Sequence, residues 1–97
     1  MLCLRERIMQ NNILVEISKY LPNGRCIKYI LYLLRDGSGD EIYSLSAEFT
    51  GGEYCDRAFV EDISRDRGRA ERFLYLISFE EVEPCHLRDV VYDLLPL

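Results

Sequence analysis

The stretch CIKYILYLL, residues 26–34, decides the fold, because it is rich in the β-branched and aromatic residues that favour strands. It follows ILVEISKY, residues 13–20, in which apolar and polar residues alternate, so that one strand face would carry Ile13, Val15 and Ile17. Between the two runs, LPNGR supplies the proline, asparagine and glycine that tight turns require. The sequence therefore predicts an antiparallel hairpin over residues 13–34.

The second strand of this hairpin is apolar on both faces, which an antiparallel sheet with one solvated face would not show. One face would carry Ile27, Tyr29, Leu31 and Leu33, and the other would carry Ile30, Tyr32 and Leu34. We expect C-terminal helices to cover the first face. Either the N-terminal dozen residues or a second copy of the protein would cover the other, which makes Ile30, Tyr32 and Leu34 the candidate interaction residues.

The residues after the hairpin predict two more strands, and the spacing of apolar residues then changes from that of a strand to that of a helix. Residues 42–49 alternate apolar and polar side chains, and residues 54–63 give a weaker strand pattern, so four strands joined by short turns would form a meander. Beyond residue 63, one apolar stripe at helical spacing comprises Ala70, Phe73, Leu74 and Ile77. Ser64 or Asp66 can cap the start of this helix.

A second helix is expected to begin near Pro84, whose fixed φ suits a first helical position, and to end before Pro96. Its apolar face would carry Leu87, Val90, Val91, Leu94 and Leu95. The predicted fold class is α+β: an antiparallel β-meander of about four strands, followed by two C-terminal helices packed on one face of the sheet. Residues 1–97 would form a single domain, with an N-terminal extension (1–12), the meander (13–63) and the helical pair (64–97).

Composition narrows the classes of function. The 97-residue chain has a formal net charge of −5, which opposes the binding of phosphate backbones, so nucleic acid is not an expected partner. The longest apolar run contains Lys28 and is too short to cross a bilayer as a helix. The N-terminal residues lack the apolar core of a secretory signal. We therefore expect a cytoplasmic protein without a membrane partner.

The four cysteines are scattered one to each predicted segment: Cys3, Cys26, Cys55 and Cys85. Their spacing matches neither a zinc motif nor a dithiol redox motif. In a reducing compartment they would remain free thiols and behave as small hydrophobic residues. We therefore expect no metal site and no cofactor.

The C-terminal part of the chain carries a distinctive sequence pattern. It comprises DISRDR at residues 62–67, Ala70 with Glu71, and then Val82, Pro84, Leu87, Asp89, Val90, Val91 and Asp93. With this pattern the chain, from residue 43 onward, resembles a family of small bacterial proteins, largely from Firmicutes, that is classed as a domain of unknown function. The resemblance implies a bacterial cytoplasmic setting but no activity, and the family pattern does not include a Cys-His pair.

Cys85 and His86, the only histidine, form the candidate pair for thiol chemistry. The N–H groups and the dipole of a helix start stabilise a thiolate, so Cys85 could serve a small thiol-dependent enzyme or a redox sensor. Neighbouring helix residues point about 100° apart, however, and neither an orienting acid nor an oxyanion hole has a sequence signature. We therefore assign no catalytic residue.

Arg65, Arg67 and Arg69 are candidate anion-binding residues near the start of the first predicted helix. Acidic residues lie among them and cancel most of their field, which favours a solvated, ion-paired surface. The leading hypothesis is a non-enzymatic protein-interaction module that binds another protein or self-associates as a homo-oligomer. The alternative is the thiol-dependent enzyme or redox sensor that uses Cys85 with His86.

Overall fold

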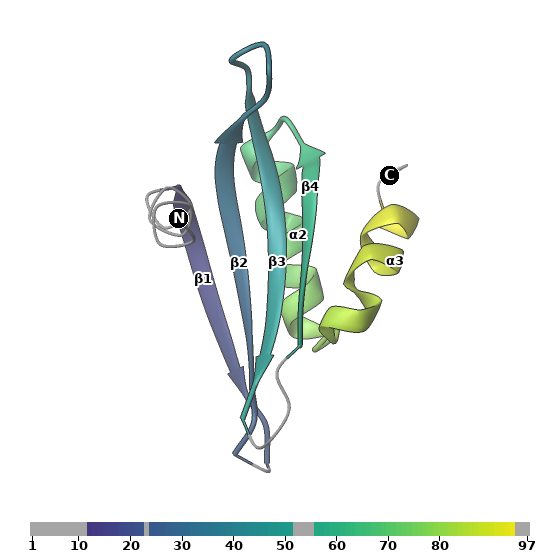
Figure 1. The fold of residues 1–97 in the computed structure, drawn as a ribbon. Coiled ribbons are helices and arrows are strands. Elements are labelled where there is room, and N and C mark those ends of the chain that lie inside the picture. Colours follow the sequence, from purple (N-terminus) through teal and green to yellow (C-terminus); the bar gives the residue numbers. More distant parts are fainter. Residues whose placement is uncertain (1–11, 23, 52–55, 95–97) are drawn as a thin grey trace.

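The computed structural model describes residues 12–22, 24–51 and 56–94, and it shows four strands followed by two helices (Figure 1). The strands pair in sequence order as one antiparallel sheet, so the predicted α+β meander is confirmed. The elements are β1 (Ile13–Tyr20), β2 (Cys26–Arg35), β3 (Glu41–Thr50), β4 (Asp56–Ser64), α2 (Arg67–Phe79) and α3 (Pro84–Leu94). Several sequence predictions lie outside the described residues: those on residues 1–11, Asn23, Cys55, Leu95 and Pro96.

The turn between β1 and β2 depends on two glycines. Gly24 has a φ of +76°, in the left-handed region that favours glycine, and the Leu21 N–H donates to the Arg25 carbonyl oxygen at 2.8 Å. Gly51, with a φ of +111°, follows β3 and passes close to this turn. A Cβ atom at position 51 would lie 2.8 Å from the Gly24 oxygen and from the Arg25 Cα. Glycine therefore lets the end of β3 approach the first turn.

The first residue of β1 departs from the prediction. Ile13 pairs with Tyr32, whereas Val15 pairs with Leu31, so the register shifts by one residue between them. Because side chains alternate across a strand, this β-bulge moves Ile13 to the face opposite that of Val15 and Ile17. The prediction that these three residues share one face is therefore wrong for Ile13.

A second irregularity lies in β4. Tyr43 pairs with Ser64 and Leu45 pairs with Val60, so the intervening residues of β4 bulge opposite a single residue of β3, Ser44. The Asp62 N–H, in a residue with a φ of +57°, donates to the Ser44 hydroxyl oxygen at 3.1 Å. The bulge returns Ile63 to the core, where only 3% of its surface is exposed.

The hydrophobic core lies between one face of the sheet and the two helices. Its residues from the two central strands are Ile27, Tyr29, Leu31, Tyr43, Leu45, Ala47 and Phe49. The helices contribute the predicted stripe of Ala70, Phe73, Leu74 and Ile77, together with Leu87 and Val91. Burying each large aliphatic side chain stabilises the fold by roughly 1.5–3 kcal/mol relative to its exposure. This face of β2 is therefore the one that the helices cover, as predicted.

Both helix starts follow their sequence signals. The Asp66 carboxylate caps α2 by accepting a hydrogen bond from the Arg69 N–H at 2.8 Å, and Pro84 is buried at the first position of α3. Between the helices, the Val82 carbonyl oxygen accepts a hydrogen bond from the Tyr29 hydroxyl at 2.8 Å, which ties the turn to β2. Within the described residues, neither helix has the length and apolar character needed to cross a membrane.

Candidate functional site

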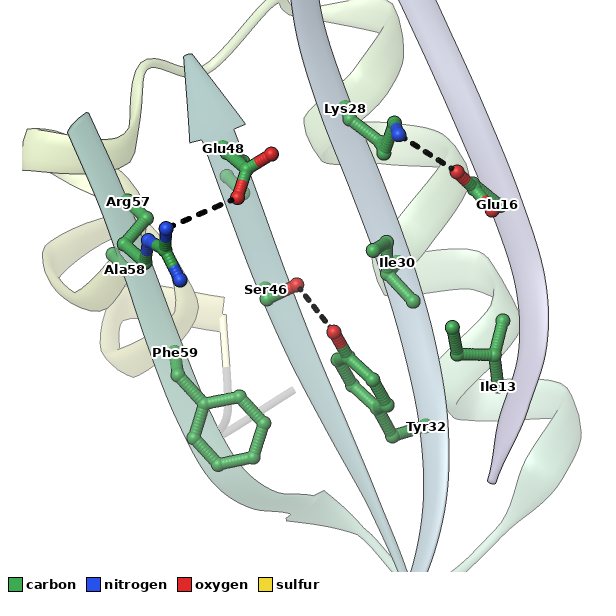
Figure 2. Close-up of a pocket in the computed structure, with 11 residues that line it drawn as sticks. Ile13, Glu16, Lys28, Ile30, Tyr32, Ser46, Glu48, Arg57, Ala58 and Phe59 are labelled. Carbon is green, nitrogen blue, oxygen red and sulfur yellow. Dashed lines mark hydrogen bonds and ion pairs between the residues drawn. The ribbon is translucent and has the colours of Figure 1, made fainter. Parts of the chain in front are cut away.

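The face of the sheet turned away from the helices carries side chains from all four strands (Figure 2). We call it the outer face and define it by Ile13, Glu16, Lys28, Ile30, Tyr32, Ser46, Glu48, Arg57 and Phe59. These residues line a hollow of about 530 Å³. These side chains share one face because alternate residues of each strand point to the same side of the sheet. The bulge in β1 adds Ile13.

The middle of the outer face is built around two aromatic rings. Tyr32 of β2 and Phe59 of β4 meet edge to face, with ring centroids 5.7 Å apart. Ser46, which lies between them on β3, donates a hydrogen bond from its hydroxyl to the Tyr32 hydroxyl oxygen at 3.3 Å. Ile30 is half-buried beside this group, and Tyr32 is only 7% exposed. The centre of the outer face is therefore largely apolar, and the Tyr32 hydroxyl is the polar group within it.

Two cross-strand ion pairs lie beside the aromatic rings (Figure 2). Lys28 Nζ lies 3.2 Å from Glu16 Oε1, and Arg57 Nη2 lies 3.8 Å from Glu48 Oε2. The hydrogen bond and the charge of Glu16 raise the pKa of Lys28 above its ordinary value. Partly exposed pairs of this kind contribute only about 0–1 kcal/mol to folding. Across the sheet from β1 to β4, the four charges alternate as negative, positive, negative and positive.

The sequence analysis found part of this face. Ile30 and Tyr32, two of the three predicted interaction residues, line the hollow, whereas Leu34 is half-buried and is not among its described lining residues. Phe59 was not predicted, although alternation along β4 places it on the face opposite that of Val60, and neither was Ile13, which the bulge moved. The order of the charges becomes visible only once the pairing register of the strands is known.

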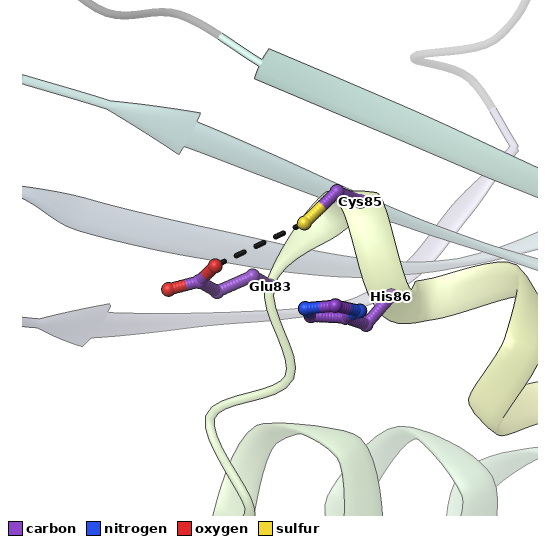
Figure 3. Close-up of side chains that lie close together, drawn as sticks. All are labelled: Glu83, Cys85 and His86. Atoms are coloured by element: carbon purple, nitrogen blue, oxygen red, sulfur yellow. Dashed lines mark hydrogen bonds between the residues drawn. The ribbon is translucent and has the colours of Figure 1, made fainter.

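Glu83, Cys85 and His86 lie together at the start of α3 (Figure 3). The Cys85 thiol donates to Glu83 Oε1 at 3.9 Å, and one ligand-type atom of each residue lies within 4.8 Å of the other two. Among the described residues, the hydrogen bond of the thiol goes to this carboxylate and not to His86. Cys85 and His86 nevertheless lie closer together than helix periodicity alone suggested. All three side chains are exposed, and the thiol-enzyme hypothesis stays a prediction.

The three candidate anion-binding arginines separate in the structure. Arg65 lies 2.9 Å from an Asp36 carboxylate oxygen and 3.5 Å from one of Asp40, whereas Arg67 pairs with Glu71 at 3.0 Å. Hydrogen bonds from the Asp40 and Ser38 N–H groups, and then Arg65, hold the pKa of the Asp36 carboxyl below its usual range. The Arg69 guanidinium lies over the Phe73 ring at 6.0 Å. Anion binding stays a prediction.

A second, smaller hollow of about 350 Å³ lies against the helices. Its lining residues are Arg69, Arg72, Phe73, Leu76 and Leu94. Beside it, α2 exposes the large apolar side chains Tyr75, Leu76 and Phe79. The outer face remains the broader candidate, because it joins side chains of four strands in one hollow.

Comparison of the chain with protein-family models, with curated proteins and with solved structures gave no match. The resemblance to a bacterial family of unknown function therefore stays a prediction.

Proposed function

We propose that the protein is a non-enzymatic module that self-associates by packing the outer faces of two copies against each other. The observation that supports this proposal is the alternating row of charges on the outer face. Its largely apolar centre provides the contact area. The occupant of the outer face is then a second copy of this chain. The setting we propose is a reducing compartment such as the bacterial cytoplasm, where exposed Cys85 and half-buried Cys26 remain free thiols.

The charge row is self-complementary under one symmetry operation. A two-fold axis parallel to the strands reverses the strand order, so that β1 faces β4 of the second copy and β2 faces β3. Lys28 and Glu48 are paired residues of β2 and β3, so Lys28 then faces the other copy's Glu48. Glu16 pairs with Ile30, two residues along β2 from Lys28, so it lies diagonally across from Arg57 of the other copy. Each charge thus has an opposite charge across the interface, which favours this orientation over others and speeds the encounter.

The centre of the outer face supplies the apolar contact. Tyr32 is buried and forms the floor of this centre, whereas the half-buried Phe59 and Ile30 present the apolar surface. Aromatic side chains such as Phe59 contribute strongly at interfaces. The charges lie on one side of this centre and supply polar contacts of the kind that border the apolar core of specific protein interfaces. Two sheets packed face to face at about 10 Å would bring these side chains together as in a β-sandwich.

Sedimentation velocity over a micromolar concentration range tests the proposal with two charge reversals. Lys28→Glu and Glu48→Lys each place like charges across the interface, a juxtaposition that costs several kcal/mol, so each variant alone is expected to be a monomer. An equimolar mixture of the two variants is expected to restore the dimer, because each copy then meets opposite charges on its partner. Within each variant chain, the like charges that the substitution brings together remain in the mixture. Recovery of the dimer therefore reports only on contacts between chains.

Two controls fix the interpretation. Arg35→Glu breaks an exposed ion pair of 3.4 Å with Glu41 at the far end of β2 and is expected to leave the dimer intact. Deletion of residues 1–11 is also expected to leave it intact. A wild-type monomer that dimerises only after this deletion would instead assign the outer face to the N-terminal segment, and would overturn the proposal. Mixed variants that remain monomeric would also contradict it.

A further inference from the structure

We propose that Glu83, Cys85 and His86 form a binding site for a divalent transition-metal ion of the zinc type. The three side chains offer a carboxylate oxygen, a sulfur and an imidazole nitrogen, the donor atoms that zinc binds in proteins. Their ligand atoms already lie within 4.8 Å of one another (Figure 3). Ligand atoms around a tetrahedral zinc stand about 3.5 Å apart, so binding requires them to approach by only about 1 Å.

The backbone that carries these ligands is held in place from both sides. Before the cluster, the Val82 carbonyl oxygen accepts the Tyr29 hydroxyl hydrogen bond at 2.8 Å, and Pro84 is buried between two of the ligands. The backbone N–H of His86 donates to the backbone carbonyl oxygen of Glu83 at 2.9 Å and closes the first helical turn. Only exposed side chains therefore have to move when an ion binds, which lowers the entropic cost of assembling the site.

The donor set selects the class of ion. Sulfur and imidazole ligands suit zinc and its transition-metal neighbours, whereas magnesium and calcium prefer oxygen ligands throughout. Three protein ligands leave one tetrahedral position, which exposure of the cluster opens to water. On binding, the Cys85 thiol releases its proton to solvent and the thiolate takes the ion. The preceding acids, Glu80 and Glu81, add negative charge nearby.

Cobalt(II) titration provides the first test, because a cysteine thiolate bound to cobalt gives a charge-transfer absorption band in the near ultraviolet. The wild-type protein is expected to show this band at one cobalt per chain, and zinc is expected to displace it. Cys85→Ser is expected to abolish the band, whereas Cys26→Ser, which changes the other described thiol, is expected to keep it. A band that survives Cys85→Ser, or a wild-type protein without one, would overturn the proposal.

Zinc titration followed by NMR tests the other two ligands. His86 is the only histidine in the chain, so its imidazole signals report on this site without ambiguity. These signals are expected to shift with one equivalent of zinc and to return after chelation. Glu83→Gln and His86→Gln are expected to weaken zinc binding by at least about tenfold, and the neighbouring acid variant Glu80→Gln by less than about twofold. Equal losses for Glu80→Gln and Glu83→Gln would reduce the effect to general charge attraction and contradict the site.

This site lies at the start of α3, on the helix side of the sheet. Its binding test requires no self-association, and none of its ligands belongs to the outer face. A monomeric protein that binds zinc would therefore contradict self-association and support the metal site. A dimer that shows no cobalt band would contradict the metal site and support self-association.

Discussion

Both faces of β2 carry apolar side chains, but the surroundings of the two faces differ. On one face Ile27, Tyr29 and Leu31 are fully enclosed by neighbouring strands and two helices. On the other, Ile30 and Tyr32 lie in a hollow that has two ion pairs at one end (Figure 2). Apolar character alone therefore does not distinguish a folding core from an association surface. The charges on the outer face make the difference, because their ion pairs are partly exposed in the monomer and can also contact opposite charges of a second copy.

The sharpest way to separate the two faces is to remove apolar atoms from each. Leu45→Ala leaves a cavity on the helix-covered face, where Leu45 is fully buried, and is expected to lower the free energy of unfolding by about 2–5 kcal/mol. Ile30→Ala on the outer face is expected to lower it by less than about 1.5 kcal/mol in the monomer. Urea denaturation at a concentration where both variants are monomeric measures the difference. Equal losses would place Ile30 in the folding core and break the distinction.

Within one face, two serines of β3 sharpen the comparison further. Ser44 is fully buried and accepts the Asp62 N–H, so Ser44→Ala leaves that donor without its acceptor and is expected to cost about 1–3 kcal/mol of stability. Ser46 lies one pleat away and makes only a 3.3 Å contact with the Tyr32 hydroxyl, so Ser46→Ala is expected to cost about 1 kcal/mol or less. Thermal or chemical unfolding distinguishes them. A Ser44→Ala variant as stable as the wild type would contradict a stabilising role for the hydrogen bond between Ser44 and the Asp62 N–H in the β4 bulge.

A third prediction concerns Tyr29 and alkaline pH. Burial, and then the charges of Glu81 and Glu83, raise the pKa of this phenol above its ordinary value of 10.0. The unfolded chain therefore loses this proton before the folded one, so stability is complete below about pH 10 and falls as the pH rises further. Tyr29→Phe is expected to cost about 0.5–1.5 kcal/mol at neutral pH and to flatten the alkaline decline. The control variant Tyr75→Phe, which changes an exposed tyrosine, is expected to lose stability with pH as the wild type does. If Tyr29→Phe also lost stability at the wild-type rate, the Tyr29 phenol would not be the cause of the alkaline decline.

Much of the fold could be predicted because the apolar residues of each segment follow a single spacing, either that of a strand or that of a helix. Period-two alternation locates the strands, the apolar stripe from Ala70 to Ile77 locates α2, and Pro84 marks the start of α3. The two bulges could not be predicted, because an extra residue is defined only by the strand opposite it. Ile13 therefore changed face although its own sequence context reads as a regular strand.

The candidate sites show the same limit. Ile30 and Tyr32 could be assigned to the outer face from β2 alone, because alternation within one strand decides it. The charge row could not, since Glu16, Lys28, Glu48 and Arg57 come from four strands and meet only through the register. Glu83 was missed for a related reason: four consecutive residues match no spaced metal motif, and only the side-chain directions bring its carboxylate to the sulfur.

The most direct test of the central claim is zero-length cross-linking of an equimolar mixture of isotope-labelled and unlabelled protein. A carbodiimide joins a lysine amine to a carboxylate in contact with it, and the chain contains only two lysines, Lys19 and Lys28. Mass spectrometry is expected to find Lys28 of one copy joined to Glu48 of the other, in mixed-isotope pairs. Links confined to single chains, or links between chains made through Lys19 alone, would contradict self-association through the outer face.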